Sequence, residues 1–144
     1  MDQRLKARLK ALPFFFMEKT FTRIDTTEAA NKLIDSLKEK YGEIIFHQSG
    51  GCCDGSAPMC YPKGEFYLGG SDVEVGITHG VHFYMGASQF SYWEHTHLTL
   101  DAIPGNGGQF SLDNGTGMRF IIRSRLYSDE EWTYLSQHPV KQCG

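Results

Sequence analysis

Between Asp25 and Gly42, the chain repeats its apolar side chains at helical spacing. These side chains are Ala30, Leu33, Ile34, Leu37 and Tyr41. Apolar positions three or four residues apart form one stripe along an α-helix, and that stripe can be buried against the rest of a domain. The Asp25-Thr26-Thr27-Glu28 run supplies side-chain oxygens that can cap a first turn, and Gly42 is a typical stop. The pattern predicts an amphipathic helix of about four turns.

After Gly42 the pattern changes to short apolar runs and to alternation of apolar with polar residues, which is typical of β-strands. The predicted strands cover residues 43–47, 73–77, 81–85, 98–102, 109–112 and 118–124. A helical turn is predicted over 88–95, and a last short helix after the Ser128–Glu131 capping box. Tight turns at His79-Gly80 and Asp113-Asn114-Gly115 join neighbouring strands into hairpins, so the sheet is predicted to be mostly antiparallel.

These elements predict an α+β fold, in which one long N-terminal helix packs on a mostly antiparallel β-sheet or small barrel. A length of 144 residues suits one domain. We expect residues 1–16 to be a disordered or frayed extension, residues 17–138 a single domain and residues 139–144 a flexible tail. The basic extension ends in an apolar run, 11–17. Three interpretations stay open: a frayed leader, a translation start at Met17 rather than Met1, or a targeting or membrane-surface segment.

Charge and composition argue against two classes of protein. The 14 Lys and Arg residues are outnumbered by 17 Asp and Glu, and the net charge of −3 does not suit a cationic nucleic-acid binder. No apolar run approaches the roughly 18–20 residues that a membrane span requires. We therefore expect a cytoplasmic protein, whose thiols are free or metal-bound. A homodimer is expected, because small β domains often leave an exposed edge strand.

The densest chemistry lies in a glycine-rich loop that carries three of the four cysteines. Cys52, Cys53 and Cys60 fall within nine residues, and His47 precedes them by five. Thiolates bind zinc, copper(I) and iron–sulfur centres, and glycines let a loop bring them around one centre. The segment predicts a site for zinc, iron or an iron–sulfur cluster with these four ligands. Two alternatives stay open: a reactive or redox thiol, and cysteines buried as small apolar residues.

Four further residues are candidate ligands or supporting groups. Asp54, beside the cysteines, can orient a thiol or an imidazole, or instead form a turn before a glycine. His95 shares one strand face with a second histidine and can bind a metal or stay solvated. Arg123 and Arg125 can hold a carboxylate or phosphate, or line a solvated strand edge. No nucleophile elbow, Walker loop, dinucleotide fingerprint or zinc-protease motif is present in the sequence.

The segment His47-Gln-Ser-Gly-Gly-Cys-Cys-Asp-Gly-Ser-Ala-Pro-Met-Cys-Tyr-Pro closely resembles the signature of a bacterial family known as domain of unknown function 779. Two later runs resemble the same family: Gln89-Phe-Ser-Tyr-Trp-Glu-His-Thr and Gly108-Gln-Phe-Ser-Leu-Asp. Members are often encoded beside aldehyde or alcohol dehydrogenases. The resemblance therefore implies an accessory role near aldehyde metabolism, with an aldehyde dehydrogenase as an expected partner.

The predicted order of elements is also similar to that of the HesB-like A-type iron–sulfur carriers. On this resemblance, Cys52 or Cys53 takes the place of the carriers' first cysteine. The carriers end in a Cys-Gly-Cys motif, whereas this chain has Arg123-Ser-Arg125 in that region. Cys60 or Cys143 would then have to supply the missing thiolates.

The residues and the resemblance together favour a non-catalytic accessory protein that binds a metal or an iron–sulfur cluster. One alternative is a thiol-dependent enzyme, in which a cysteine near His47 attacks a small aldehyde. A second alternative is a subunit that binds an aldehyde dehydrogenase without any metal. The identity of the metal and the reaction, if there is one, are left open by the sequence.

Overall fold

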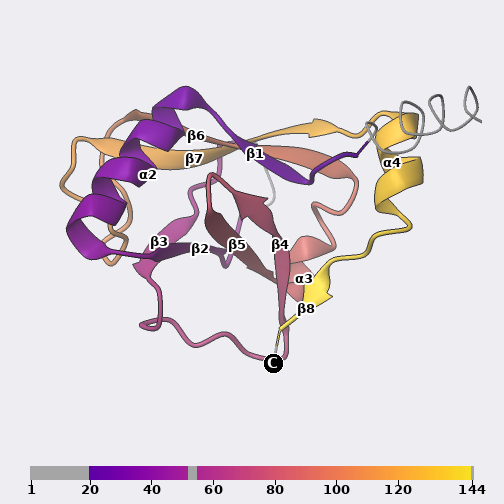
Figure 1. The fold of residues 1–144 in the computed structure, drawn as a ribbon, viewed down its shortest axis with the longest axis horizontal. Coiled ribbons are helices and arrows are strands. Elements are labelled where there is room, and N and C mark those ends of the chain that lie inside the picture. The colour runs from indigo at the N-terminus through magenta and orange to yellow at the C-terminus, as the bar shows by residue number, and fades with distance from the viewer. Residues whose placement is uncertain (1–19, 52–54, 144) are drawn as a thin grey trace, which may run out of the picture.

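The computed structural model describes residues 20–51 and 55–143, which form eight strands and three short helices (Figure 1). A three-stranded sheet has the order β1-β6-β7, with β1 (Ile24–Thr26), β6 (Thr96–Pro104) and β7 (Met118–Leu126). A five-stranded sheet has the order β3-β2-β5-β4-β8, with β3 (Met59–Pro62), β2 (Ile44–Gln48), β5 (Val81–Gly86), β4 (Asp72–Thr78) and β8 (Lys141–Gln142). The helices are α2 (Glu28–Tyr41), α3 (Ala87–Phe90) and α4 (Asp129–Leu135).

The predicted architecture, one long N-terminal helix on a mostly antiparallel sheet or small barrel as in the HesB-like proteins, is wrong. The described chain is mostly β, its strands are divided between two sheets, and α2 spans only 14 residues. Both sheets are mixed, because β1 runs parallel to β6 and β2 runs parallel to β5. Parallel pairs join segments far apart in the chain, such as Ile24 and Leu98. The alternation of side chains within one strand does not reveal such a partner.

Local elements with strong sequence signals are confirmed. The predicted helix is α2: the Thr27 side chain accepts a hydrogen bond from the Ala30 N–H at its start, and the Gly42 N–H bonds back to Lys38 at its end. The β4–β5 hairpin is also present. Its turn has positive φ at His79 (49°) and Gly80 (73°), as a tight right-twisted hairpin requires.

The strand predicted over 109–112, and with it a second hairpin, is wrong. This segment forms turns, in which side chains replace strand neighbours as hydrogen-bond acceptors. The Ser111 hydroxyl accepts from the Cys60 N–H at 2.8 Å, and the Asp113 carboxylate accepts from the Phe120 N–H at 3.0 Å. The sequence pattern also missed β1, β3 and β8. Strand β8 lies in the segment that we expected to be a flexible tail, and it pairs with β4.

The core fills the space between the two sheets and beneath α2. Three phenylalanine rings with no exposed surface lie at its centre: Phe46 of β2, Phe83 of β5 and Phe120 of β7. The Phe46 ring lies 6.0 Å from that of Phe83 and meets the Phe120 ring edge to face at 4.7 Å. Aromatic pairs favour this arrangement, so Phe46 holds the two sheets against each other.

We expect Phe46→Ala to lower the free energy of unfolding by about 3–5 kcal/mol, because it removes a fully buried ring and leaves a cavity between the sheets. Tyr67→Ala is the matched control, since the Tyr67 residue is 92% exposed, and its effect should stay within about 0.5 kcal/mol. Urea denaturation of both variants measures the difference. Equal losses in the two variants would contradict this account of the core.

Candidate functional site

Cys60, one of the predicted metal ligands, lies in the core. It pairs with Phe46 across β2 and β3, and no part of it is exposed. Burial, reinforced by the nearby Asp113 carboxylate, raises the pKa of the Cys60 thiol above its usual range. Thiolates rather than thiols bind metals and attack substrates. The structure therefore places Cys60 as a buried apolar side chain.

His47, the second described member of the predicted metal site, points to the opposite face of the five-stranded sheet. It follows Phe46 in β2 and pairs with Met59, whereas Phe46 pairs with Cys60. Since successive side chains of a strand point to opposite faces, His47 and Cys60 do not converge. Cys52, Cys53 and Asp54 lie outside the described residues. Within residues 20–51 and 55–143, no group of three or more His, Cys, Asp or Glu side chains is arranged to hold a metal ion.

Both ring nitrogens of His47 have side-chain partners. Its Nδ1 lies 2.9 Å from Ser49 Oγ, and its Nε2 lies 2.9 Å from Asp72 Oδ1. The other oxygen of the Asp72 carboxylate accepts the Gly69 N–H at 2.9 Å. Three strands position this chain of contacts, because His47 belongs to β2 and Asp72 to β4, with β5 between them.

The charge of Asp72 fixes the direction of these hydrogen bonds. Burial raises the pKa of Asp72, but its hydrogen bonds from His47 and Gly69 and the neighbouring imidazole outweigh burial, and the pKa is lowered overall. An ionised carboxylate can only accept hydrogen bonds, so Nε2 of His47 must donate. In the neutral imidazole Nδ1 is then the acceptor, and the Ser49 hydroxyl donates to it.

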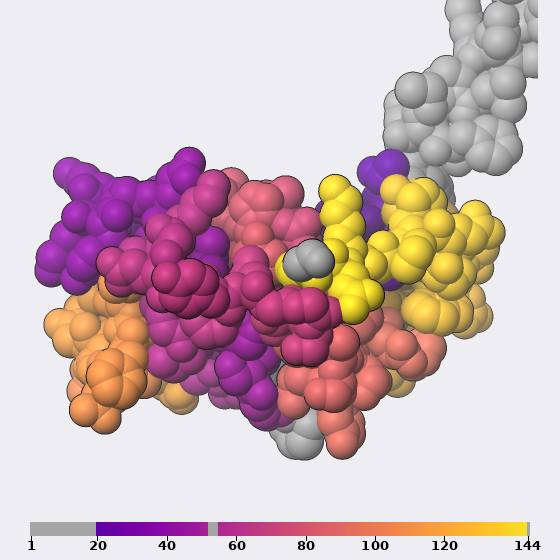
Figure 2. Space-filling view, turned by 90° about the horizontal axis from the view of Figure 1, so that it is seen from below, coloured from indigo at the N-terminus to yellow at the C-terminus, as the bar shows by residue number. Residues whose placement is uncertain are grey.

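An aromatic wall covers the imidazole. The Phe66 ring lies 4.6 Å from the His47 ring, and the Tyr61 ring stacks on Phe66 at 4.8 Å. The His47 and Asp72 side chains are only 6% and 14% exposed, while Ser49 is exposed. The buried pair thus reaches solvent at its serine end. Phe66 belongs to the segment that follows β3. Figure 2 shows this segment, in magenta, beside the yellow C-terminal residues.

The backbone that follows Ser49 is held in place from α3 and the turn after it. The Gly51 carbonyl accepts hydrogen bonds from the Gln89 amide and, at 3.2 Å, from the Trp93 indole N–H. Gly51 has a φ of +87°, and a Cβ there would lie 2.4 Å from Ser56 Oγ. The position therefore requires glycine.

The remaining predicted site residues have other partners. Arg123 Nε donates to Asp101 Oδ2 at 2.8 Å, and Arg125 donates to both oxygens of Glu131 at 2.7 and 2.9 Å. The exposed His95 ring lies 4.4 Å from the Trp132 ring. Both guanidinium groups thus bind carboxylates of the chain itself. Among the hydrogen bonds of the described residues, none joins these three side chains to His47.

The fold and these contacts define a small, mostly β domain with a Ser–His–Asp hydrogen-bond chain on one sheet face. Residues 33–126, more than half of the chain, match the family described as domain of unknown function (DUF779). The chain belongs to this family, as its glycine- and cysteine-rich segment had indicated. A comparison with curated proteins gives no match. In the part of the chain that the structure describes, no helix is long and apolar enough to cross a membrane.

The Arg125–Glu131 pair predicts a pH-dependent stability. Hydrogen bonds from Arg125, followed by that from the Ser128 N–H, lower the pKa of Glu131 from 4.5 to about 2. Because this pKa is lower in the folded than in the unfolded state, its contribution to stability is complete above about pH 5 and is lost as the pH falls toward about 2. We expect Glu131→Gln to lower the free energy of unfolding by about 1–3 kcal/mol at pH 7.

The difference in unfolding free energy between wild type and Glu131→Gln, measured by denaturation across this pH range, should shrink with acidification. Glu39→Gln serves as the control, because Glu39 is an exposed residue of α2. A loss in Glu131→Gln that stays constant from neutral to acidic pH would contradict the assignment.

Proposed function

We propose that this chain is a small hydrolase that cleaves an ester or thioester by acyl transfer to Ser49. The Ser49–His47–Asp72 hydrogen-bond chain, with its two distances of 2.9 Å, supports the proposal. A hydroxyl is a weak nucleophile unless a base in hydrogen-bond reach takes its proton and a third group orients that base. In this chain His47 is the base and Asp72 the orienting group.

The roles of the two imidazole nitrogens follow from Asp72. In the well-known serine protease triad, Nε2 takes the serine proton and Nδ1 donates to the aspartate. Here Asp72 binds Nε2, so Nδ1 takes the proton from Ser49. The two ring nitrogens have exchanged roles relative to the protease triad because Ser49 follows His47 by only two residues, at the end of β2.

In the proposed first step, Ser49 Oγ bonds to the carbonyl carbon and its proton passes to His47 Nδ1. The carbonyl π electrons move to oxygen, and the intermediate then collapses and breaks the bond to the leaving group. The leaving alkoxide or thiolate takes the proton from His47 and departs as an alcohol or a thiol. Water then attacks the acyl group, again with His47 as base, which releases a carboxylic acid and restores Ser49.

Two features of the surroundings suit such a reaction. Gly50 and Gly51 are exposed and follow Ser49 directly, and their lack of side chains leaves the backbone accessible to a developing oxyanion. Phe66 and Tyr61 provide an apolar wall next to His47. We infer a small apolar acyl group as the substrate portion that lies against these rings.

The accessory role that the sequence predicted stays a prediction. A metal or iron–sulfur centre would now depend on Cys52 and Cys53, because Cys60 is buried on the sheet face opposite to His47. The expected association with an aldehyde dehydrogenase, and the homodimer, likewise stay predictions.

Hydrolysis of 4-nitrophenyl butyrate, together with labelling by a fluorophosphonate probe, tests the proposed function. We expect the probe to label Ser49 and the Ser49→Ala variant to lose labelling and at least about 10³-fold in kcat/KM, because no nucleophile remains. Ser71→Ala is the matched control, since Ser71 is an exposed serine next to Asp72, and it should retain both properties.

Circular dichroism and the melting temperature show whether each variant is folded. Labelling or hydrolysis that persists in folded Ser49→Ala would overturn the proposal. So would a wild-type protein that cleaves neither this ester nor butyryl thioesters.

A further inference from the structure

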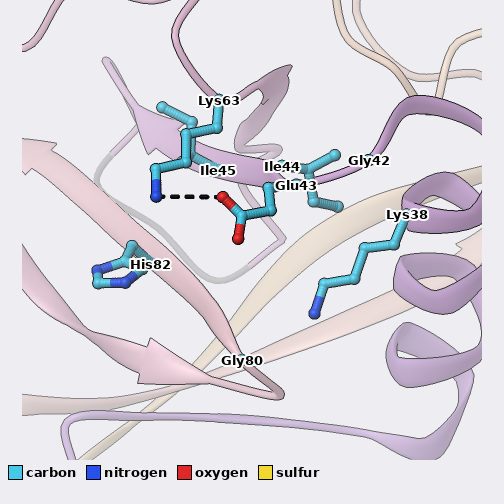
Figure 3. Close-up of a pocket in the computed structure, with 8 residues that line it drawn as sticks. All are labelled: Lys38, Gly42, Glu43, Ile44, Ile45, Lys63, Gly80 and His82. Atoms are coloured by element: carbon cyan, nitrogen blue, oxygen red, sulfur yellow. Dashed lines mark ion pairs between the residues drawn. The ribbon is translucent and has the colours of Figure 1, made fainter.

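A separate pocket of about 340 Å³ lies at the C-terminal end of α2 (Figure 3). Its walls come from the end of α2, the start of β2, the residue after β3 and the β4–β5 hairpin. Ser49, His47 and Asp72 do not line it, so it is independent of the proposed hydrolytic site. Its volume is at the lower end of the range found for small-molecule sites.

Basic side chains from three different elements surround this pocket. Figure 3 shows Lys38, Lys63 and His82 around one space, with the Glu43 carboxylate between the two lysines. Lys38 Nζ donates to the His79 carbonyl at 3.0 Å, which leaves further ammonium protons available. The Glu74 carboxylate binds Nδ1 of His82. Nε2 of the same ring is therefore the nitrogen left for a ligand.

Glycine at position 80 helps to place Lys38. A Cβ at this position would lie 3.1 Å from Lys38 Nζ, and the φ of +73° also disfavours any other residue. The space beside the hairpin turn is therefore kept for the ammonium group. This steric fit between Gly80 and Lys38 does not depend on the charge of the pocket.

The ion pair inside the pocket is weak and exchangeable. Lys63 Nζ lies 3.1 Å from Glu43 Oε2, and the two side chains are 61% and 77% exposed. Exposed pairs of this kind contribute little free energy, so a ligand oxyanion can compete with Glu43 for Lys63. Lys38 and Lys63 bring two ammonium groups to the pocket against the Glu43 carboxylate, while the second carboxylate nearby, that of Glu74, is bonded to His82.

We propose that this pocket binds a small organic monocarboxylate, with its carboxylate between Lys38 and Lys63 and its apolar end against Ile45, which pairs with His82 on the same sheet face. The C-terminal end of α2, where the helix dipole is negative, opposes a phosphate dianion more strongly than a monoanion, so the attraction for a carboxylate must come from Lys38 and Lys63. The Ile45 side chain suits a short hydrocarbon chain rather than a purely ionic ligand, whereas Ile44 packs in the core with Phe46.

Amide chemical shifts during titration with butyrate, butyramide and inorganic phosphate test the proposal. We expect butyrate to shift the amides of residues 42–45 and 80–82, with weaker binding of phosphate and of the uncharged butyramide. Lys38→Met and Lys63→Met should each weaken butyrate binding by about fivefold, and Glu43→Gln should tighten it, because it removes the competing carboxylate. Lys40→Met is the matched control, since Lys40 lies on the same helix and does not line the pocket.

Butyramide binding as tight as butyrate, phosphate binding that is tighter, or a Lys40→Met effect equal to that of Lys63→Met would overturn the assignment. An absence of shifts at residues 42–45 and 80–82 would do the same. None of these outcomes bears on Ser49, so the two proposals fail or stand separately.

Discussion

The alternation of side chains along β2 is the constraint on which both the core and the candidate site depend. Phe46 points inward and meets Phe120 of the other sheet, so the next residue, His47, must point outward. A shift of β2 by one residue would bury the imidazole in the core and expose the phenyl ring. The burial of Phe46 therefore fixes where His47 lies.

The same sheet brings the partners of His47 to it. Asp72 begins β4, two strands away from β2, and it stays ionised through hydrogen bonds from His47 and the Gly69 N–H. Ser49 follows His47 by two residues at the end of β2, so no further strand or helix is needed to bring it to the ring. A buried imidazole, a carboxylate bonded to its Nε2 and an exposed hydroxyl at its Nδ1 thus result from one strand order. The cysteine on the neighbouring strand, Cys60, is directed into the core by the register that directs His47 out of it.

The elements that were predicted correctly from the sequence are those that local interactions determine. Caps and a glycine stop define α2, the turn residues define the β4–β5 hairpin, and a capping box begins α4. The sequence could not predict the parallel pairings, because these depend on contacts between distant segments. The sequence selected His47 as a candidate metal ligand, and that role stays a prediction. The contacts of His47 with Ser49 and Asp72 were not predicted: a serine two residues away is a weak signal, and only the folded sheet brings Asp72 to the ring.

The most direct test of this account is the position of the proton on the His47 ring, observed by ¹⁵N NMR of the imidazole nitrogens. We predict a proton on Nε2, where Asp72 accepts it, and an unprotonated, hydrogen-bonded Nδ1 in the neutral ring. In Asp72→Asn the amide side chain can donate to Nε2, and the proton should move to Nδ1. A wild-type ring with its proton on Nδ1 would contradict the account, because His47 could not then accept the proton of Ser49.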